Sequence, residues 1–175
     1  MLFRDATPDD AAGIALVRVA AWQHAYEDIV DPRLVAALDV EDERERWEQR
    51  LAVAADAVNR QHVTVVEHDG RALGFTAVLA RSREADVPDG TGELAAIYVH
   101  PVAQGAGLGP RMLDAAAARL GELDATRATL RVLTANTVAR TFFGSRGWRL
   151  DGDAPDDAPD GDVPGPTERL VRDFR

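Results

Sequence analysis

Three glycines within five residues form the stretch of this sequence best suited to chemistry. Gly105, Gly107 and Gly109 follow an apolar segment. Apolar residues with helical spacing begin at Leu108, and Pro110 suits the first turn of a helix because its missing N–H is not needed there. Glycine exposes backbone N–H groups, and a helix N-terminus attracts negative charge. The stretch therefore predicts an anion site, most often for phosphate; a glycine-rich turn without a ligand is the alternative.

The glycine spacing differs from two common phosphate-binding motifs. A P-loop requires a lysine after its last glycine, and this sequence contains no lysine. A dinucleotide-binding fingerprint requires G-x-G-x-x-G directly after a strand. Here the glycines run G-x-G-x-G and follow a His-Pro break. The spacing thus disfavours both motifs.

The elements that must position this loop can be predicted from periodicity and turn residues. Strands are predicted at residues 2–6, 62–67, 71–80, 93–99, 128–133 and 167–174, with a further strand starting at Trp148. Helices are predicted from Pro8 to the break at Asp31-Pro32, at 33–38, at 40–54, at 108–120, and from a cap at Asn136 to a stop at Gly147. Asp69-Gly70 predicts a hairpin. Residues 151–166, rich in Asp, Pro and Gly, predict an acidic surface loop.

Composition narrows the class of protein. With 175 residues and 46% hydrophobic residues, we expect one folded domain over residues 1–175. The absence of cysteine excludes disulfides, thiolate catalysis and Cys-based zinc sites, and no metal site is predicted. No apolar run is long enough for a membrane span and no signal peptide is evident, which favours the cytoplasm. A net charge of −10 without a basic stripe argues against nucleic acid; it suits either a cationic amine or ordinary solubility.

A second pattern lies about thirty residues after the glycine loop, and the two together resemble one family. Gln104, Gly107 and Gly109 fit Arg/Gln-x-x-Gly-x-Gly/Ala, while Asn136, Ala139, Gly147 and Trp148 fit most of Asn-x-x-Ala-x-x-x-Tyr followed by Gly-Phe. Both patterns resemble motifs of the GNAT N-acetyltransferase superfamily, and the predicted order of elements along the chain is similar too. The resemblance implies an α/β (α+β mixed sheet) fold, in which a central mixed sheet of six to seven strands is flanked by about four helices.

The resemblance also implies a cofactor, acetyl-CoA, with CoA as the product. In the family, a bulge separates the strand before the glycine loop from its neighbour, and backbone groups there bind the pantetheine arm. Val99 N–H would polarise the thioester carbonyl, whereas Asn136 would approach the pantetheine or simply cap its helix. The residues expected to bind the cofactor are Ile97, Tyr98, Val99, Gln104, Gly105, Ala106, Gly107, Leu108, Gly109, Pro110, Asn136, Ala139, Phe142 and Phe143.

The catalytic residues of the family are matched less completely in this sequence than its glycine loop. Glu93, six residues before Val99, matches a glutamate that the family often uses as base; alternatively it only starts the strand and faces water. His24, His62 and His100 are weaker candidates. The family's tyrosine, whose hydroxyl lies near the CoA sulfur, is replaced here by Phe143. Tyr98, Ser145 or water would then protonate the thiolate, or transfer would be slow.

We expect the acceptor to lie against the first two helices. Trp22, Tyr26, Glu93 and Trp148 are the expected substrate-binding residues, although plain core packing explains an aromatic residue equally well. The predicted reaction is direct transfer of an acetyl group, in a ternary complex, to the primary amine of a small molecule. Acetylation of a protein or peptide and a silent acyl-CoA-binding module are the alternatives. The resemblance leaves a homodimer open.

Overall fold

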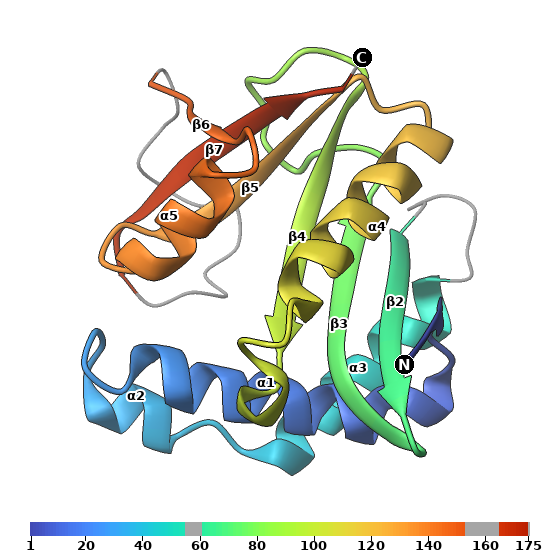
Figure 1. The fold of residues 1–175 in the computed structure, drawn as a ribbon, viewed down its shortest axis with the longest axis vertical. Coiled ribbons are helices and arrows are strands. Elements are labelled where there is room, and N and C mark those ends of the chain that lie inside the picture. The colour runs from blue at the N-terminus through green and yellow to red at the C-terminus, as the bar shows by residue number, and fades with distance from the viewer. Residues whose placement is uncertain (55–60, 153–164, 175) are drawn as a thin grey trace.

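A seven-stranded mixed sheet forms the centre of the protein (Figure 1). The computed structural model describes residues 1–54, 61–152 and 165–174. Over these ranges the strands are β1 (Leu2–Asp5), β2 (Gln61–His68), β3 (Arg71–Leu79), β4 (Thr91–Val99), β5 (Arg127–Leu133), β6 (Arg149–Leu150) and β7 (Thr167–Asp173). Their order in the sheet is β1-β2-β3-β4-β5-β7-β6, and only the β4–β5 pair is parallel.

Helices cover both faces of this sheet (Figure 1). In the described part of the chain the α-helices are α1 (Ala11–Tyr26), α2 (Pro32–Ala36), α3 (Val40–Ala54), α4 (Leu108–Glu122) and α5 (Thr137–Gly144). Apolar residues of α1 and α3 pack with Phe75 and Ala77 of β3. Those of α4 and α5 pack with Val78 and Leu94 on the opposite face. The predicted mixed sheet flanked by helices is confirmed.

Local signals located most boundaries, with small differences. Asp69 and Gly70 have φ values of +50° and +73°, as the predicted tight hairpin requires. The helix predicted from Pro8 begins instead with a 3-10 turn, Pro8–Asp10, in which the Asp10 carboxylate accepts the Thr7 N–H at 2.8 Å. Most of the loop predicted at 151–166 lies outside the described residues.

The feature that positions the site is the separation of β4 from β5. The two strands pair at Thr91–Arg127, Gly92–Ala128 and Glu93–Thr129, and they diverge beyond Glu93 (Figure 1). On its other side β4 stays paired with β3, with Ala95 bulged between two neighbouring pairs. The bulge and the separation that the family resemblance implied are therefore present. They leave residues 94–99 of β4 with one edge that pairs with none of the described strands.

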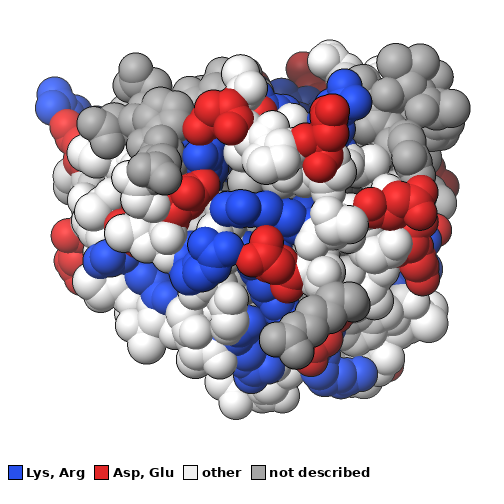
Figure 2. All heavy atoms as spheres, turned by 90° about the horizontal axis from the view of Figure 1, so that it is seen from above, with Lys and Arg blue, Asp and Glu red and all other residues white. Residues whose placement is uncertain are grey.

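Charged side chains bind β5 and β7 to the loop that follows β3. Arg131 donates to both oxygens of Glu84 at 2.7 and 2.9 Å, and Arg169 donates to Glu84 at 3.0 Å. Arg169 also pairs with Asp86 at 2.6 Å and Asp151 at 2.8 Å, although its side chain is only 2% exposed. Figure 2 shows arginines near the middle of this end of the molecule, with carboxylates among and around them. These five residues, Glu84, Asp86, Arg131, Asp151 and Arg169, form the charged cluster. It connects the loop between β3 and β4 to β5 and β7, close to the last residue pair between β4 and β5.

Candidate functional site

Two connected cavities follow the diverging strands and together form the cleft. The wider, about 670 Å³, lies between the glycine loop, α1 and α5. The narrower, about 200 Å³, continues between residues 94–99 of β4 and residues 130–133 of β5. The residues that line both are Ala25, Ile97, Val99, Gln104, Asn136, Ala139 and Phe143. The structure thus brings the glycine motif, the strand and the asparagine motif to one place.

The glycine loop has the backbone shape that its sequence predicted. Gly105 and Gly107 both have φ of +75°, a left-handed conformation that side chains other than glycine's rarely adopt. Gly107 is also the N-cap of α4, so no capping side chain covers the first N–H groups of this helix. A Cβ at either glycine would meet no atom within 4 Å. The loop therefore offers open space and uncovered N–H donors, as an anionic group requires.

The free edge of β4 presents backbone groups to the cleft. His100 N–H donates to Leu73 C=O of β3 at 2.9 Å. Because neighbouring residues of a strand direct their polar groups to opposite sides, Val99 directs its N–H and C=O away from β3. Gln104 Nε2 donates to that Val99 carbonyl at 3.1 Å and so ties the glycine loop to the strand. The Val99 N–H consequently faces the cleft, as the resemblance implied.

The asparagine motif builds the opposite wall. Asn136 Oδ1 accepts the Ala139 N–H at 3.0 Å, which confirms that it caps α5. Its side chain also lines the cleft, so capping and cofactor contact do not exclude one another. Phe142 and Phe143 stack edge to face with ring centres 5.2 Å apart, and Phe142 faces Gly109. They provide an apolar wall beside the loop.

An aromatic group occupies the α1 side of the cleft. Trp22 Nε1 donates to the Tyr98 hydroxyl at 3.0 Å, and the rings of Trp22 and Tyr26 meet edge to face at 4.7 Å. Tyr26 and Tyr98 line the cleft, whereas Trp22 supports them from behind. Burial, followed by the nearby Tyr98 hydroxyl, raises the pKa of Tyr26 to about 12, although the Asn136 side chain opposes this shift. Tyr26 therefore stays neutral and can donate a hydrogen bond.

Glu93 lies at the closed end of the cleft, where β4 and β5 separate. It is only 6% exposed, so the alternative, that it only starts the strand and faces water, is wrong. Arg83 donates to its carboxylate from Nη2 at 2.6 Å and from its backbone N–H at 2.9 Å. Glu93 is not among the described residues that line the two cavities. Its role as base stays a prediction.

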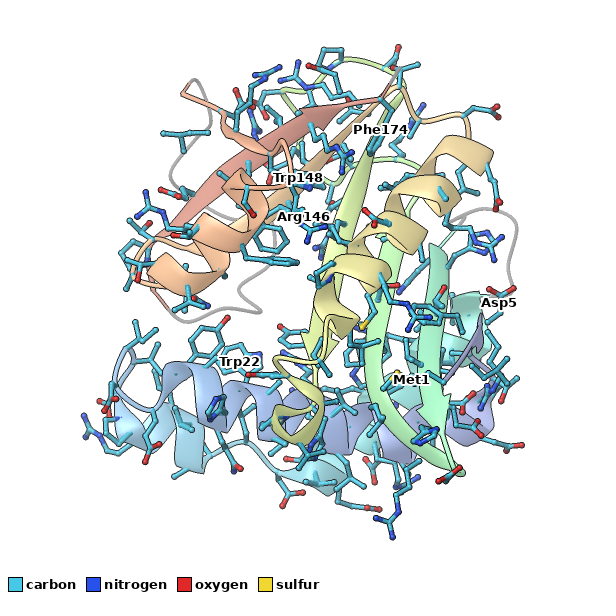
Figure 3. All side chains as sticks on the ribbon, in the orientation of Figure 1. Met1, Asp5, Trp22, Arg146, Trp148 and Phe174 are labelled. Carbon is cyan, nitrogen blue, oxygen red and sulfur yellow. The ribbon has the colours of Figure 1, made fainter. Side chains whose placement is uncertain are left out.

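Two other candidates lie away from the cleft or are already engaged. Trp148 is 4% exposed in the core between α5 and the sheet, with its ring 6.2 Å from that of Phe143 and well apart from Trp22 (Figure 3). Its position supports core packing rather than the expected substrate contact. Ser145 donates its hydroxyl to Phe142 C=O at 2.8 Å, so this hydroxyl is occupied.

Sequence reasoning missed several residues that shape the cleft. Ala21 and Ala25, one helical turn apart on α1, line it, and their small size leaves the space open. Their spacing of four residues, which places both on one face of a helix, was the sequence signal that could have identified them. Arg131 also lines the cleft and is bound by Glu84, 47 residues away in the sequence, a pairing that no local pattern reveals. Across residues 1–54, 61–152 and 165–174, no group of His, Asp or Glu is arranged to ligate a metal, and none of the helices there has the length and apolarity to span a membrane.

Comparisons with known proteins agree with this geometry. The model of the Acetyltransferase (GNAT) family matches residues 22–148. Among solved structures, PaiA N-acetyltransferase from Thermoplasma acidophilum, in complex with coenzyme A, is 16% identical with a TM-score of 0.77, covering 99% of this chain and 98% of that one. YncA from Salmonella typhimurium, with its cofactor acetyl-CoA, is 19% identical with a TM-score of 0.65, covering 99% and 93%.

Ribosomal-protein-alanine N-acetyltransferase from Brucella melitensis is also similar, with 18% identity and a TM-score of 0.68 over 99% of this chain and 100% of that one. No curated protein matches the sequence. At these identities the solved structures support the fold, while the family model covers most of the chain. This protein therefore belongs to the GNAT acetyltransferase family.

Proposed function

We propose that this protein transfers the acetyl group of acetyl-CoA to the primary amine of a small molecule by direct attack in a ternary complex. The observation that carries the proposal is the unpaired edge of β4, which lies in one cleft with the glycine loop and the uncovered N-terminus of α4. Acetyl-CoA would supply an acyl group already activated as a thioester. The protein's task is then to position the two reactants and polarise a carbonyl.

The residues present fit this cofactor. The N–H groups of the glycine loop and of the first turn of α4 would hold the pyrophosphate. Backbone groups of Ile97 and Val99 would bind the pantetheine arm, and Val99 N–H would polarise the carbonyl oxygen. Phe142 and Phe143 would cover the apolar side. The open space around Gly105 and Gly107, where a Cβ would meet nothing, agrees with a bulky group above the loop.

The acceptor amine would enter from the α1 side. Tyr26 and Tyr98 line that part of the cleft, and Trp22 holds Tyr98 in place. We propose Glu93 as the base that takes the proton of the ammonium through a water molecule, because it lies where the cleft closes. A net charge of −10 suits a cationic acceptor.

Calorimetric titration of acetyl-CoA into the wild type and Gly107→Val tests the donor site. We expect micromolar binding by the wild type and none by the variant, since a side chain there would occupy the space of the pyrophosphate and strain a left-handed backbone. Gly121→Ala is the matched control: it changes a glycine of the same helix, at its far end, where a Cβ also meets nothing. Absence of binding by a folded wild type would contradict the proposal.

The acceptor class requires a second assay. Release of CoA thiol would be followed with a panel of primary amines, including arylalkylamines, polyamines and amino acids, and with peptides bearing a free N-terminal alanine. Turnover with small amines supports the proposal, whereas turnover with peptides alone favours the protein-acetylating alternative. Binding of CoA without turnover of any acceptor, unchanged in Glu93→Gln, would indicate a silent acyl-CoA-binding module.

A further inference from the structure

The cleft lacks a phenol at Phe143 but contains two others. The sequence has two tyrosines, and both Tyr26 and Tyr98 line the narrow part of the cleft. They approach from different elements: Tyr98 from β4 and Tyr26 from α1. A departing thiolate in this cleft would therefore have phenol groups within the same cavity, although α5 offers none.

The two phenols differ in their surroundings. Tyr98 accepts a hydrogen bond from Trp22 Nε1 at 3.0 Å, and its ring lies against Phe75 at 5.4 Å, so its polar end is held toward α1. Both phenols line the cavity with Asn136 and Phe143. Tyr26 is 9% exposed, and its hydroxyl also contacts the side chain of Asn136, the residue that caps α5. Tyr26 is thus the phenol whose hydroxyl lies against the helix that carries Phe143.

We propose that the Tyr26 hydroxyl donates a hydrogen bond to the departing sulfur of the coenzyme, in place of the hydroxyl that Phe143 lacks. The inference rests on the proposed function. In this proposal α1 has two roles. It lines the acceptor side of the cleft, and through Tyr26 it also supplies a hydroxyl that acts on the acetyl donor.

The donation leaves the proton on Tyr26. The amine nitrogen forms the new C–N bond, the C–S bond breaks, and sulfur leaves with its electron pair. The amine's proton passes to the base and then to solvent, from which the thiolate is later protonated. Full transfer from Tyr26 would be uphill, because its pKa of about 12 lies well above the value of about 8.5 for an ordinary thiol. A neutral phenol that stabilises the developing thiolate is sufficient.

The first test needs no acceptor amine. Calorimetry would compare CoA with desulfo-CoA, which lacks the thiol, between pH 7 and pH 9.5. If Tyr26 binds the thiolate, the preference of the wild type for CoA should rise about tenfold to 100-fold over this range, as expected for a hydrogen bond to a charged group. In Tyr26→Phe the preference should stay nearly constant, and in Tyr26→Phe/Phe143→Tyr it should rise again.

A packing role for Tyr26 would not produce this pattern, since desulfo-CoA affinity would change along with CoA affinity. The same rise in Tyr26→Phe as in the wild type would overturn the proposal, as would its loss in Tyr98→Phe instead. Thermal unfolding followed by circular dichroism would verify that each variant is folded.

The second test uses the best amine of the panel. Tyr26→Phe should lower kcat about tenfold to 100-fold with little change in the Kd of acetyl-CoA, and Phe143→Tyr should recover most of that loss in the double variant. Unchanged kcat in Tyr26→Phe overturns this inference while leaving the proposed function intact. A wild type that fails to bind CoA at all contradicts the proposed function instead, so the two failures are distinguishable.

Discussion

At the scale of single residues, the proposed chemistry depends on a carboxylate that lies in the protein interior and not, as acidic residues usually do, at the surface. Glu93 is an acidic residue at the start of a strand, yet it is buried and held by three donors of Arg83: the backbone N–H, Nε and Nη2. Such a pair can either orient a base or only satisfy a buried charge. The two roles make different predictions for the two partners.

Replacing Glu93 by glutamine should lower kcat about 100-fold, because a base is lost, while the KM for acetyl-CoA should hardly change. Arg83→Gln is the matched control: it breaks the same ion pair but keeps the carboxylate. Steady-state kinetics and thermal unfolding of both variants would separate the roles. Equal losses of kcat and of stability in the two variants would show that Glu93 serves only the ion pair.

At the scale of elements, side chains of the charged cluster link the two parts of the sheet beyond the point where backbone pairing between β4 and β5 ends. β4 and β5 share three residue pairs, and beyond them the loop after β3 reaches β5 and β7 through Glu84, Arg131 and Arg169. The hydroxyls of Ser82 and Thr129, 2.8 Å apart, add a neutral link. The cluster thus ties the loop before β4 to β5 and β7, the strands on the other side of the cleft.

Glu84→Gln should lower the free energy of unfolding by about 3–5 kcal/mol, the usual cost of removing one partner from a buried ion pair. Two arginines would then lack their shared carboxylate. Asp173→Asn, which removes the partner of Arg149 in an exposed pair, should cost far less. Urea unfolding of both variants measures the difference, and similar losses would contradict the structural role of the cluster.

The cluster also predicts a pH dependence of stability. Burial alone would raise the pKa of Glu84, but the hydrogen bonds and charges of Arg131 and Arg169 outweigh it and lower the pKa. Hydrogen bonding from Arg169 likewise lowers the pKa of Asp86. Groups with a lowered pKa stabilise the folded state above their unfolded values, about 4, and lose this contribution as the pH falls through the folded values.

Urea unfolding between pH 7 and pH 2.5 should therefore show a loss of stability beginning near pH 4. The slope should be shallower in Glu84→Gln, which has one fewer carboxyl to protonate. An identical slope in this variant would mean that other carboxyls dominate acid unfolding.

At the scale of the whole molecule, the cleft divides the sheet into two parts. One part contains β1 to β4 and the other contains β5, β6 and β7 (Figure 1), while apolar residues of α4 and α5 pack in one core cluster with strands of both parts. The cavities lie between them and are lined by both. A ligand that fills the cleft would contact both parts at once and should stabilise their contact.

CoA at 100 times its Kd should therefore raise the free energy of unfolding by about 2.7 kcal/mol and raise Tm. Thermal unfolding with and without CoA measures this shift. Gly107→Val should show no shift, whereas Gly121→Ala should behave like the wild type. A shift of equal size in Gly107→Val would place the binding of CoA elsewhere than on the glycine loop.

Much of this protein could be predicted from its sequence, because the signals are local. The spacing of the glycines predicted the loop before α4, because whether a residue can adopt a left-handed backbone conformation depends mainly on its own type. Asp69-Gly70 predicted the hairpin. Asn136 predicted the start of α5 because its side chain accepts a hydrogen bond from a residue only three positions further along the chain. Alternating and helical periodicity located the strands and helices for the same reason.

Only the tertiary structure decided which side chains meet. Trp148 and Trp22 look alike in the sequence and both are buried, yet they pack in different clusters: Trp148 lies with residues of α5 and β7, whereas Trp22 lies with Tyr26 beside the cleft. The Glu84–Arg131 pair and the Trp22–Tyr98 hydrogen bond join residues 47 and 76 positions apart. Periodicity places a residue on a face of its own element; the packing of that face against another element determines its partners, and so its chemistry.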